Sequence, residues 1–189
     1  MQGEQIMATI NKAYIKIKYE KEKNIIEELL KETFNSIEIN WEDRLGKIIV
    51  FDIDSFQLQL IKLVSSTLQD LGITANVLIV PFFNELFIKY LNKTNNFVST
   101  AFEVFVDNIN DEKVLSDAKY IYDSISKKDL YTIKAFLSCN ANSCAAANEL
   151  YLHRNSFNYR INNFVNQTKI DIRDLNSLMF ISLIVNICA

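Results

Sequence analysis

Residues 153–165, HRNSFNYRINNFV, decide how the last third of this 189-residue chain is interpreted. On a helical projection the apolar residues of this segment share one side, and they are Phe157, Ile161, Phe164 and Val165. Their spacing of i, i+4, i+7 and i+8 is typical of a helix side that packs against a core. The opposite side gathers uncharged polar groups and one tyrosine, namely Asn155, Ser156, Tyr159, Asn162, Asn163 and Asn166. The segment therefore predicts an amphipathic helix with a polar outer face.

This outer face lacks acidic residues. No Asp or Glu occurs between Leu150 and Ile170, although Arg154, Arg160 and Lys169 are present. A surface that approaches phosphates should exclude carboxylates, because each one repels the nucleic-acid backbone. Asn and Arg also have the fork geometry that reads base edges in the major groove of DNA. We therefore expect a recognition helix over about residues 153–165 that binds double-stranded DNA.

The residues before this segment predict two further helices. Residues 130–137 carry apolar side chains at helical spacing, and residues 140–142 (Asn-Ala-Asn) offer turn and cap groups. Residues 143–150 form an alanine-rich helix that a neighbouring helix can approach closely, and residues 151–152 break it. A helix, a short turn and a second helix with a polar face is a helix-turn-helix. The pattern alone leaves a second interpretation open, a helical subdomain with a solvated asparagine-rich face.

The run LHRNSFNYRI at residues 152–161 resembles the C-terminal helix-turn-helix of the PucR/CdaR family of bacterial transcription regulators. That family shows His-Arg-Asn-Thr and an apolar residue, then Tyr-Arg and an apolar residue, at this spacing. The resemblance extends upstream to the helix at Leu130, and downstream over residues 166–174 (NQTKIDIRD) to the apolar final helix. It implies a cytoplasmic, DNA-binding transcription regulator.

Four positions depart from the family pattern. Ser156 stands where threonine is usual, and Asn158 stands where arginine or lysine is frequent, which removes an expected phosphate contact. Ala141 and Lys169 stand where glycine is common. These departures predict that each chain binds DNA more weakly than its relatives, or that affinity is shared across a dimer.

The candidate DNA-binding residues lie at the start and on the outer side of the expected helix, and they are His153, Arg154, Asn155, Ser156, Asn158, Tyr159, Arg160 and Asn162. His153 and Arg154 are the first candidates for a base or phosphate contact, with a cap or turn role as the equal alternative for His153. For Asn155 we favour the helix N-cap over a base contact, because Asn is among the best residues at that position. Arg160 lies off the centre of the polar face and is expected to meet a phosphate.

The other candidates have less defined roles. Ser156, Asn158 and Asn162 are expected to face the groove. Tyr159 is expected to touch a phosphate or a thymine methyl group, and packing against a neighbouring helix is the alternative.

The first part of the chain predicts a sheet. Alternating and β-branched residues predict strands at residues 13–19, 36–41, 47–53 and 74–80. Helical spacing predicts helices at residues 20–34 and 56–71, and Gly72 stands where a helix C-terminus favours glycine. This β-α-β-β-α-β order is typical of a ferredoxin-like or split βαβ sheet with both helices on one face.

Many PucR/CdaR relatives carry a degenerate GGDEF-like domain before the helix-turn-helix, and this element order is compatible with one. The hairpin at residues 41–46, WEDRLG, lacks the Gly-Gly-acidic signature, so the resemblance implies no cyclase chemistry. Residues 82–125 then carry three aromatic and apolar stripes at helical spacing, which favour helix packing.

We therefore expect an α+β chain in three parts. Residues 1–82 form an α/β domain for dimerisation or sensing, residues 83–126 a helical connector, and residues 127–189 the helix-turn-helix domain. Residues 127–189 carry seven Lys and Arg against four Asp and Glu, a net charge of +3, whereas the whole chain carries −3. Residues 1–126 therefore carry −6, and this asymmetry favours an acidic partner for the last part.

The sequence shows no machinery for catalysis, so we expect no enzyme, cofactor or metal. His153 is the only histidine, and neither GxxxxGK[ST] nor GxGxxG occurs. Asp52 and Asp54 fall on one face of an expected strand, where edge solvation or capping is favoured over a metal site. Cys139, Cys144 and Cys188 form no CxxC pair and indicate buried thiols in a reducing cytosol.

The leading hypothesis is a homodimeric regulator, because one recognition helix reads only a few base pairs and a two-fold pair reads two half-sites. A small-molecule effector is left open, and no membrane contact is expected, because the longest apolar run, residues 178–187, is too short to span a bilayer. The alternative is a module for protein assembly that keeps the helix-turn-helix fold. The small net positive charge of residues 127–189 favours this alternative. An enzyme in the α/β part lacks convergent titratable groups.

Overall fold

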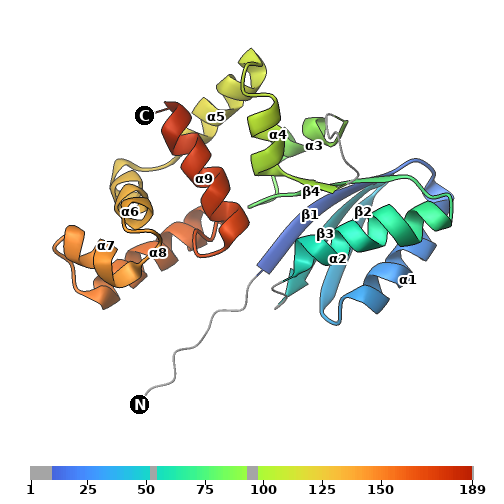
Figure 1. Cartoon of the computed structure of the whole chain (residues 1–189), viewed down its shortest axis with the longest axis horizontal. Coiled ribbons are helices and arrows are strands. Elements are labelled where there is room, and N and C mark those ends of the chain that lie inside the picture. The colour runs from blue at the N-terminus through green and yellow to red at the C-terminus, as the bar shows by residue number, and fades with distance from the viewer. Residues whose placement is uncertain (1–9, 52–54, 93–97, 189) are drawn as a thin grey trace. The chain divides into compact units, whose positions relative to one another are not determined.

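The computed structural model describes residues 10–51, 55–92 and 98–188. By internal contacts the chain divides into two compact units, Met1–Val104 and Phe105–Ala189. The elements of each unit are labelled in Figure 1. The segment 83–126, expected as a connector, contributes elements to both units.

The first unit contains a five-stranded sheet. Its strands are β1 (Ile10–Ile17), β2 (Ile37–Glu42), β3 (Leu45–Phe51), β4 (Ala75–Ile79) and β5 (Val98–Thr100). They lie in the order β2-β3-β1-β4-β5, and all pairs are antiparallel except β4 with β5. The first four strands have the predicted ferredoxin-like order, and the mixed α+β class is confirmed.

Both helical segments between these strands cover one face of the sheet (Figure 1). The 3-10 turn η1 (Glu20–Glu22) leads into α1 (Lys23–Thr33), and α2 (Phe56–Lys62) continues into the π-helix η2 (Leu63–Leu68). Their apolar sides meet the inward residues of the strands in a core that includes Ile15, Ile26, Leu30, Val50, Leu60 and Val77. The predicted cap is present, because Gly72 has a left-handed φ of 67°.

The β2–β3 hairpin turns earlier than expected. The turn lies at Asp43 and Arg44, and Asp43 has φ 51°. Gly46, expected in the polar connection, is instead paired with Trp41 inside the ladder. A Cβ on Gly46 would lie 2.7 Å from Ile15 Cγ2 and 3.0 Å from the Trp41 ring. Glycine is therefore required here by close packing rather than by the turn. Asp52 at the end of the expected strand 47–53, and Asp54 just after it, lie outside the described residues.

Two short helical segments follow β4, and they are α3 (Glu85–Ile88) and the 3-10 turn η3 (Lys89–Asn92). Beside them the ring of Phe83 meets the ring of buried Tyr14 with centroids 5.1 Å apart. The whole stretch 82–125 was expected to be helical. Instead Val98–Thr100 form β5, and α4 (Ala101–Asp107) begins only after it.

The second unit is helical from α5 onward. It contains α5 (Glu112–Ser124), α6 (Lys127–Ser138), α7 (Ser143–Glu149), α8 (Arg154–Thr168) and α9 (Leu175–Cys188). Phe105 meets Phe180 of α9 with ring centroids 5.1 Å apart, and Phe136 of α6 meets Phe157 of α8 at 6.0 Å. Among the described residues no helix is long and apolar enough to cross a membrane.

Candidate nucleic-acid interface

The helix α8 has the predicted two-sided character. Phe157, Ile161 and Phe164 are buried, each at most 3% exposed, and they fix the side that packs against α6 and α7. The outer side carries Asn155, Tyr159 and Asn166, all exposed. Because the buried side is fully used in packing, the polar side necessarily faces away from the helical core.

The start of α8 is capped by His153. This residue has an extended backbone, and its Nδ1 accepts a hydrogen bond from the Asn155 N–H at 3.2 Å. The expectation that Asn155 is the N-cap is wrong, because helical geometry already begins at Arg154. An Nδ1 that accepts must carry no proton, so the cap requires an unprotonated Nδ1.

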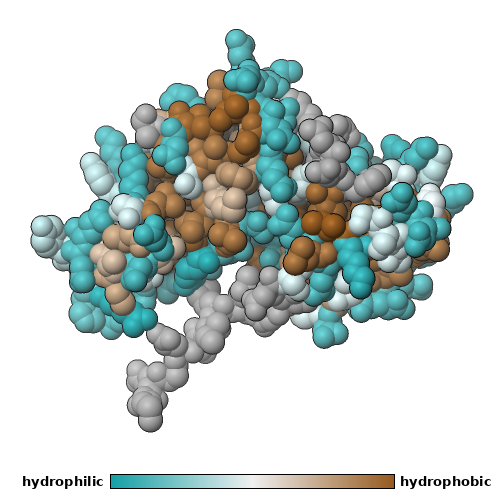
Figure 2. All heavy atoms as spheres, in the orientation of Figure 1, coloured by the Kyte–Doolittle hydropathy of each residue, from teal (hydrophilic) through white to brown (hydrophobic). Residues whose placement is uncertain are grey.

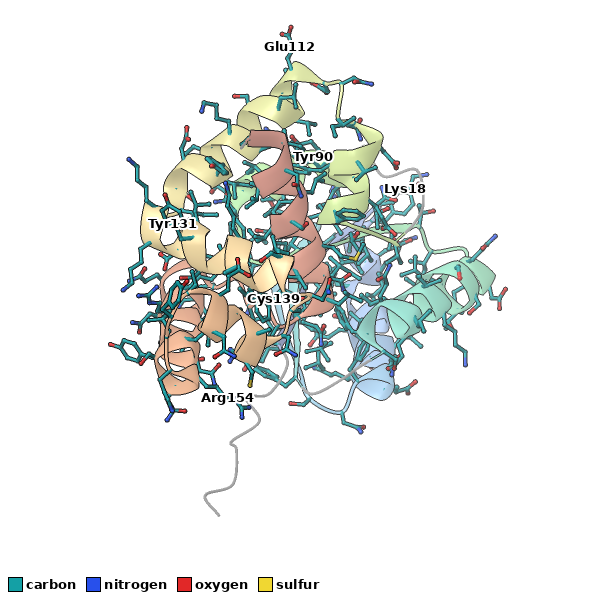
Figure 3. All side chains as sticks on the ribbon, turned by 60° about the vertical axis from the view of Figure 1, so that its left-hand side comes forward. Lys18, Tyr90, Glu112, Tyr131, Cys139 and Arg154 are labelled. Atoms are coloured by element: carbon teal, nitrogen blue, oxygen red, sulfur yellow. The ribbon has the colours of Figure 1, made fainter. Side chains whose placement is uncertain are left out.

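The structure places the candidate residues in two groups. His153, Arg154, Asn155, Ser156 and Tyr159 are exposed. In Figure 3 the Arg154 side chain points away from the ribbon at the end of the helical unit. The other three candidates, Asn158, Arg160 and Asn162, are half-buried on the flanks of the outer side.

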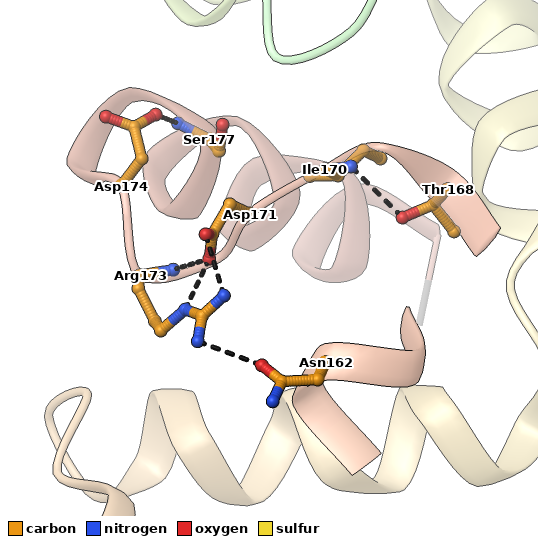
Figure 4. Close-up of polar contacts among 7 residues, drawn as sticks. All are labelled: Asn162, Thr168, Ile170, Asp171, Arg173, Asp174 and Ser177. Carbon is orange, nitrogen blue, oxygen red and sulfur yellow. Dashed lines mark hydrogen bonds and ion pairs between the residues drawn. The ribbon is translucent and has the colours of Figure 1, made fainter. Parts of the chain in front are cut away.

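Asn162 is held by the loop that follows α8 (Figure 4). The guanidinium Nη1 of Arg173 donates to Asn162 Oδ1 at 3.0 Å. The same guanidinium clamps Asp171, with Nε to Oδ1 at 2.7 Å and Nη2 to Oδ2 at 2.8 Å. Sequence reasoning missed this contact, which links residues eleven positions apart. This bond occupies the Oδ1 of Asn162, and the ion pair with Arg173 neutralises Asp171 near α8.

The helix α7 approaches α8 through two alanines. Ala146 and Ala147 are buried, at 0% and 1% exposure, and their small side chains allow the backbones of the two helices to come close. The helix begins at Asn142, whose Oδ1 accepts from the N–H groups of Cys144 and Ala145 at 3.0 and 3.1 Å. The cap predicted within residues 140–142 is therefore present at Asn142.

A small network joins the C-terminal ends of α6 and α7. Ser138 Oγ donates to both carboxylate oxygens of Glu149, at 3.1 and 3.0 Å, and Cys139 Sγ donates to Oε2 at 3.0 Å. These bonds, that from Cys139 first, lower the pKa of the Glu149 carboxyl. The Glu149 carboxylate, and then burial, raise the pKa of the Cys139 thiol. The last acid before the acid-free segment is thus bound within its own unit.

The charge of this region is positive but modest. Residues 130–187 carry five Lys and Arg against three Asp and Glu, a net charge of +2. In Figure 2 hydrophilic residues dominate the outer rim of α7 and α8, whereas hydrophobic residues gather over α9. Among the described residues no group of three or more His, Cys, Asp or Glu is placed to hold a metal ion. The outer side of α8 offers hydrogen-bonding groups and cations.

Residues 130–187 match the family model of the PucR C-terminal helix-turn-helix domain. This segment, which includes nearly all of α6 to α9, is a PucR-type helix-turn-helix domain. A segment of 42 residues is 48% identical to the uncharacterised protein YxkF of Bacillus subtilis. That match covers 22% of this chain and 14% of the relative.

The chain is also similar to the crystal structure of a regulator of polyketide synthase expression from Bifidobacterium adolescentis. The TM-score is 0.43 and the sequence identity 11%, over 95% of this chain and 79% of that chain. A TM-score at this level does not establish a common fold for the two whole chains.

Proposed function

We propose that this chain, whose residues 130–187 are a PucR-type helix-turn-helix domain, is a sequence-specific DNA-binding transcription regulator. The observation that carries the proposal is the outer side of α8. It is exposed, polar and free of acids from Leu150 to Ile170, while its inner side is fixed by buried Phe157, Ile161 and Phe164. A helix held this firmly can present its polar side to the major groove.

The residues along α8 support distinct roles. Arg154 is exposed at the first turn, where recognition helices contact base edges, and we assign it a base or phosphate contact. Arg160 is half-buried on the flank, which favours a phosphate. Asn155, Ser156 and Tyr159 are exposed and supply uncharged donors and acceptors to the groove.

Homodimerisation and a cytoplasmic location are part of this proposal. Two-fold pairing would add a second α8, and exposed Leu175 and Met179 on α9 offer apolar surface for protein contact. For an effector, the described part of the first unit has an open hollow of about 280 Å³ beside Thr33, Gln59 and Lys62. Ligand pockets usually enclose about 300–1,000 Å³, so we assign no effector site there.

The test is fluorescence anisotropy with a labelled duplex from the region upstream of the protein's own gene, at two salt concentrations. We expect binding to weaken steeply as salt rises, because phosphate neutralisation releases counterions. The double variant Arg154→Ala/Arg160→Ala should lose most of the affinity. The matched control is Lys18→Ala/Lys21→Ala, which removes the same charge from exposed positions in the first unit and should bind as the wild type does.

Two outcomes would contradict the proposal. If the folded wild-type protein binds the duplex at neither salt concentration, the helix-turn-helix serves protein assembly instead. If both double variants lose affinity equally, the effect follows from net charge, and α8 is not the contact surface.

A further inference from the structure

The turn between α7 and α8 is closed by two backbone hydrogen bonds. The N–H of Tyr151 donates to the Asn148 carbonyl at 3.0 Å, and the N–H of Leu152 donates to the Ala147 carbonyl at 2.8 Å. This pair of bonds is a Schellman motif, in which the residue after the C-cap has left-handed backbone. That residue is Tyr151, with φ 54°.

Tyrosine is an unfavourable residue at this position. A Cβ on left-handed backbone crowds the following carbonyl oxygen, so glycine is the usual choice. The chain uses glycine at the corresponding position of the first unit. There Gly72 has φ 67°, and the N–H groups of Gly72 and Ile73 donate to the carbonyls of Gln69 and Leu68 at 2.9 and 2.8 Å. The backbone motif alone therefore does not explain a tyrosine at residue 151.

Packing does not explain it either. Tyr151 is 98% exposed, which is the highest value among the exposed large apolar and aromatic side chains of the described residues. Within that part of the chain its phenol forms no hydrogen bond, and its ring meets no other aromatic ring or cation. The ring thus adds exposed apolar surface to a strained position and stabilises nothing within the chain. Unfavourable backbone that no internal contact compensates is a mark of functional sites.

The position of Tyr151 connects it to the proposed DNA surface. It lies two residues before His153, the N-cap of α8, and three before exposed Arg154. In helix-turn-helix proteins the first turn of the recognition helix enters the major groove, so the preceding turn lies beside a phosphate strand. No acid occurs in the following residues up to Ile170.

We propose that Tyr151 is a DNA-backbone contact, whose phenol O–H donates to a phosphate oxygen beside the groove that α8 enters. This inference rests on the proposed DNA-binding function. Tyrosine is among the side chains that bond to phosphates, and such contacts fix the register of the protein on the duplex without reading sequence. The contact is uncharged, so it adds affinity without releasing a counterion.

The test compares Tyr151→Phe and Tyr151→Gly with the wild-type chain. Affinity is measured by anisotropy on the upstream duplex and on a random-sequence duplex of about 30 base pairs, long enough for two half-sites. Tyr151→Phe should weaken binding to both duplexes by about tenfold, the range for a hydrogen bond to a charged group, with unchanged salt dependence. Tyr151→Gly should lose as much affinity while its unfolding temperature rises. A residue that only shapes the turn would not separate stability from binding in this way.

The matched control is Ala141→Gly, which relieves a left-handed residue at the α6–α7 corner, with φ 61°. It should raise the unfolding temperature without weakening binding to either duplex. Wild-type affinity in Tyr151→Phe would overturn the phosphate contact while the proposed function stands. Loss on the upstream duplex alone would overturn it in favour of a base contact. Failure of the wild-type protein to bind either duplex would overturn this contact and the proposed function together.

Discussion

Left-handed backbone marks three corners of the helix-turn-helix. It occurs at Asn140 and Ala141 in the first corner, at Tyr151 in the second and at Lys169 in the third, with φ 52°, 61°, 54° and 62°. Ala141 and Lys169 are the positions where the resembling family commonly has glycine. The structure gives the physical reason, because both positions need a conformation that only glycine adopts without crowding. This chain keeps the left-handed backbone at these positions with side chains other than glycine, which strains the backbone there.

The first prediction follows for Ala141. A Cβ on left-handed backbone costs about 1–2 kcal/mol, and Ala141→Gly removes that cost. Part of the gain is lost again, because glycine raises the conformational entropy of the unfolded chain. We expect the free energy of unfolding to rise by about 0.5–1 kcal/mol. Urea unfolding followed by circular dichroism at the helical band measures it. Trp41, the only tryptophan, lies in β2, so its fluorescence reports the first unit separately.

Ala145 provides the opposite control. It is exposed in α7, on regular helical backbone, where glycine costs about 1 kcal/mol relative to alanine. Ala145→Gly should therefore lower the unfolding midpoint. If both glycine variants shift the midpoint in the same direction, backbone strain at Ala141 is not the cause.

The second prediction concerns the Cys139 thiol. The Glu149 carboxylate and burial raise its pKa, so at pH 8 little of it is thiolate, which is the reactive form. Iodoacetamide should therefore modify Cys139 more slowly than Cys144, which is exposed and not buried as the sequence predicted. In Glu149→Gln the negative acceptor is gone, the pKa of Cys139 falls towards its ordinary value, and its alkylation should accelerate several-fold.

Mass spectrometry of the two cysteine-containing peptides measures both rates in one sample. Cys144 serves as the internal reference, and its rate should be the same in both proteins. An unchanged rate at Cys139 in Glu149→Gln would show that burial alone, the second cause, controls the thiol.

At the scale of the element, the start of α8 depends on one cap. His153→Ala removes the Nδ1 acceptor from the Asn155 N–H and should destabilise the chain by about 0.5–1 kcal/mol. His153→Asn supplies an Oδ1 acceptor at the same position and should keep the stability. The comparison uses the same urea experiment as Ala141→Gly.

DNA affinity of these two variants then separates the roles of the imidazole. A capping role predicts that His153→Asn binds DNA as the wild type does. A loss of affinity in stable His153→Asn would instead show that the ring contacts DNA itself.

Elements with a local signal were predicted from the sequence. The strands β1–β4 and the helices between them have alternating or helical apolar spacing over five or more residues. The buried side of α8 was assigned correctly for the same reason. β5 was missed, because three residues carry no period and their partner β4 is distant in sequence. The turns at residues 140–142 and 151–152 were predicted. Their left-handed backbone was not, because the usual signal is glycine and this chain has Asn, Ala, Tyr and Lys at the left-handed positions.

The site depends on contacts that sequence spacing does not reveal. The cap was assigned to Asn155 from residue preference, whereas backbone geometry places His153 there. The bond from Arg173 to Asn162 joins a loop to a helix flank, so it follows from tertiary packing alone. Residue type thus predicted the candidate interface, and the fold shows which of its groups already bond within the chain.

At the scale of the whole molecule, the distribution of charge limits how the chain holds DNA. The entire chain has a net charge of −3, so non-specific attraction is weak and the few cations around α8 must supply most of the electrostatic affinity. Few cations per chain also favour two chains per duplex. The salt dependence of binding therefore reports the number of chains as well as the contact surface.

The last prediction is quantitative. If about three cations per chain, including Arg154 and Arg160, meet phosphates, two chains neutralise about six, and the slope of log affinity against log salt is about −5. One chain alone would give about −3, and the dimeric Arg154→Ala/Arg160→Ala variant about −2. Anisotropy titrations at four or more salt concentrations measure the slope, and sedimentation of the complex counts the chains independently. A slope near −5 with one chain per duplex would require cations beyond α8. A slope near −3 with two chains would mean that only one recognition helix engages the duplex.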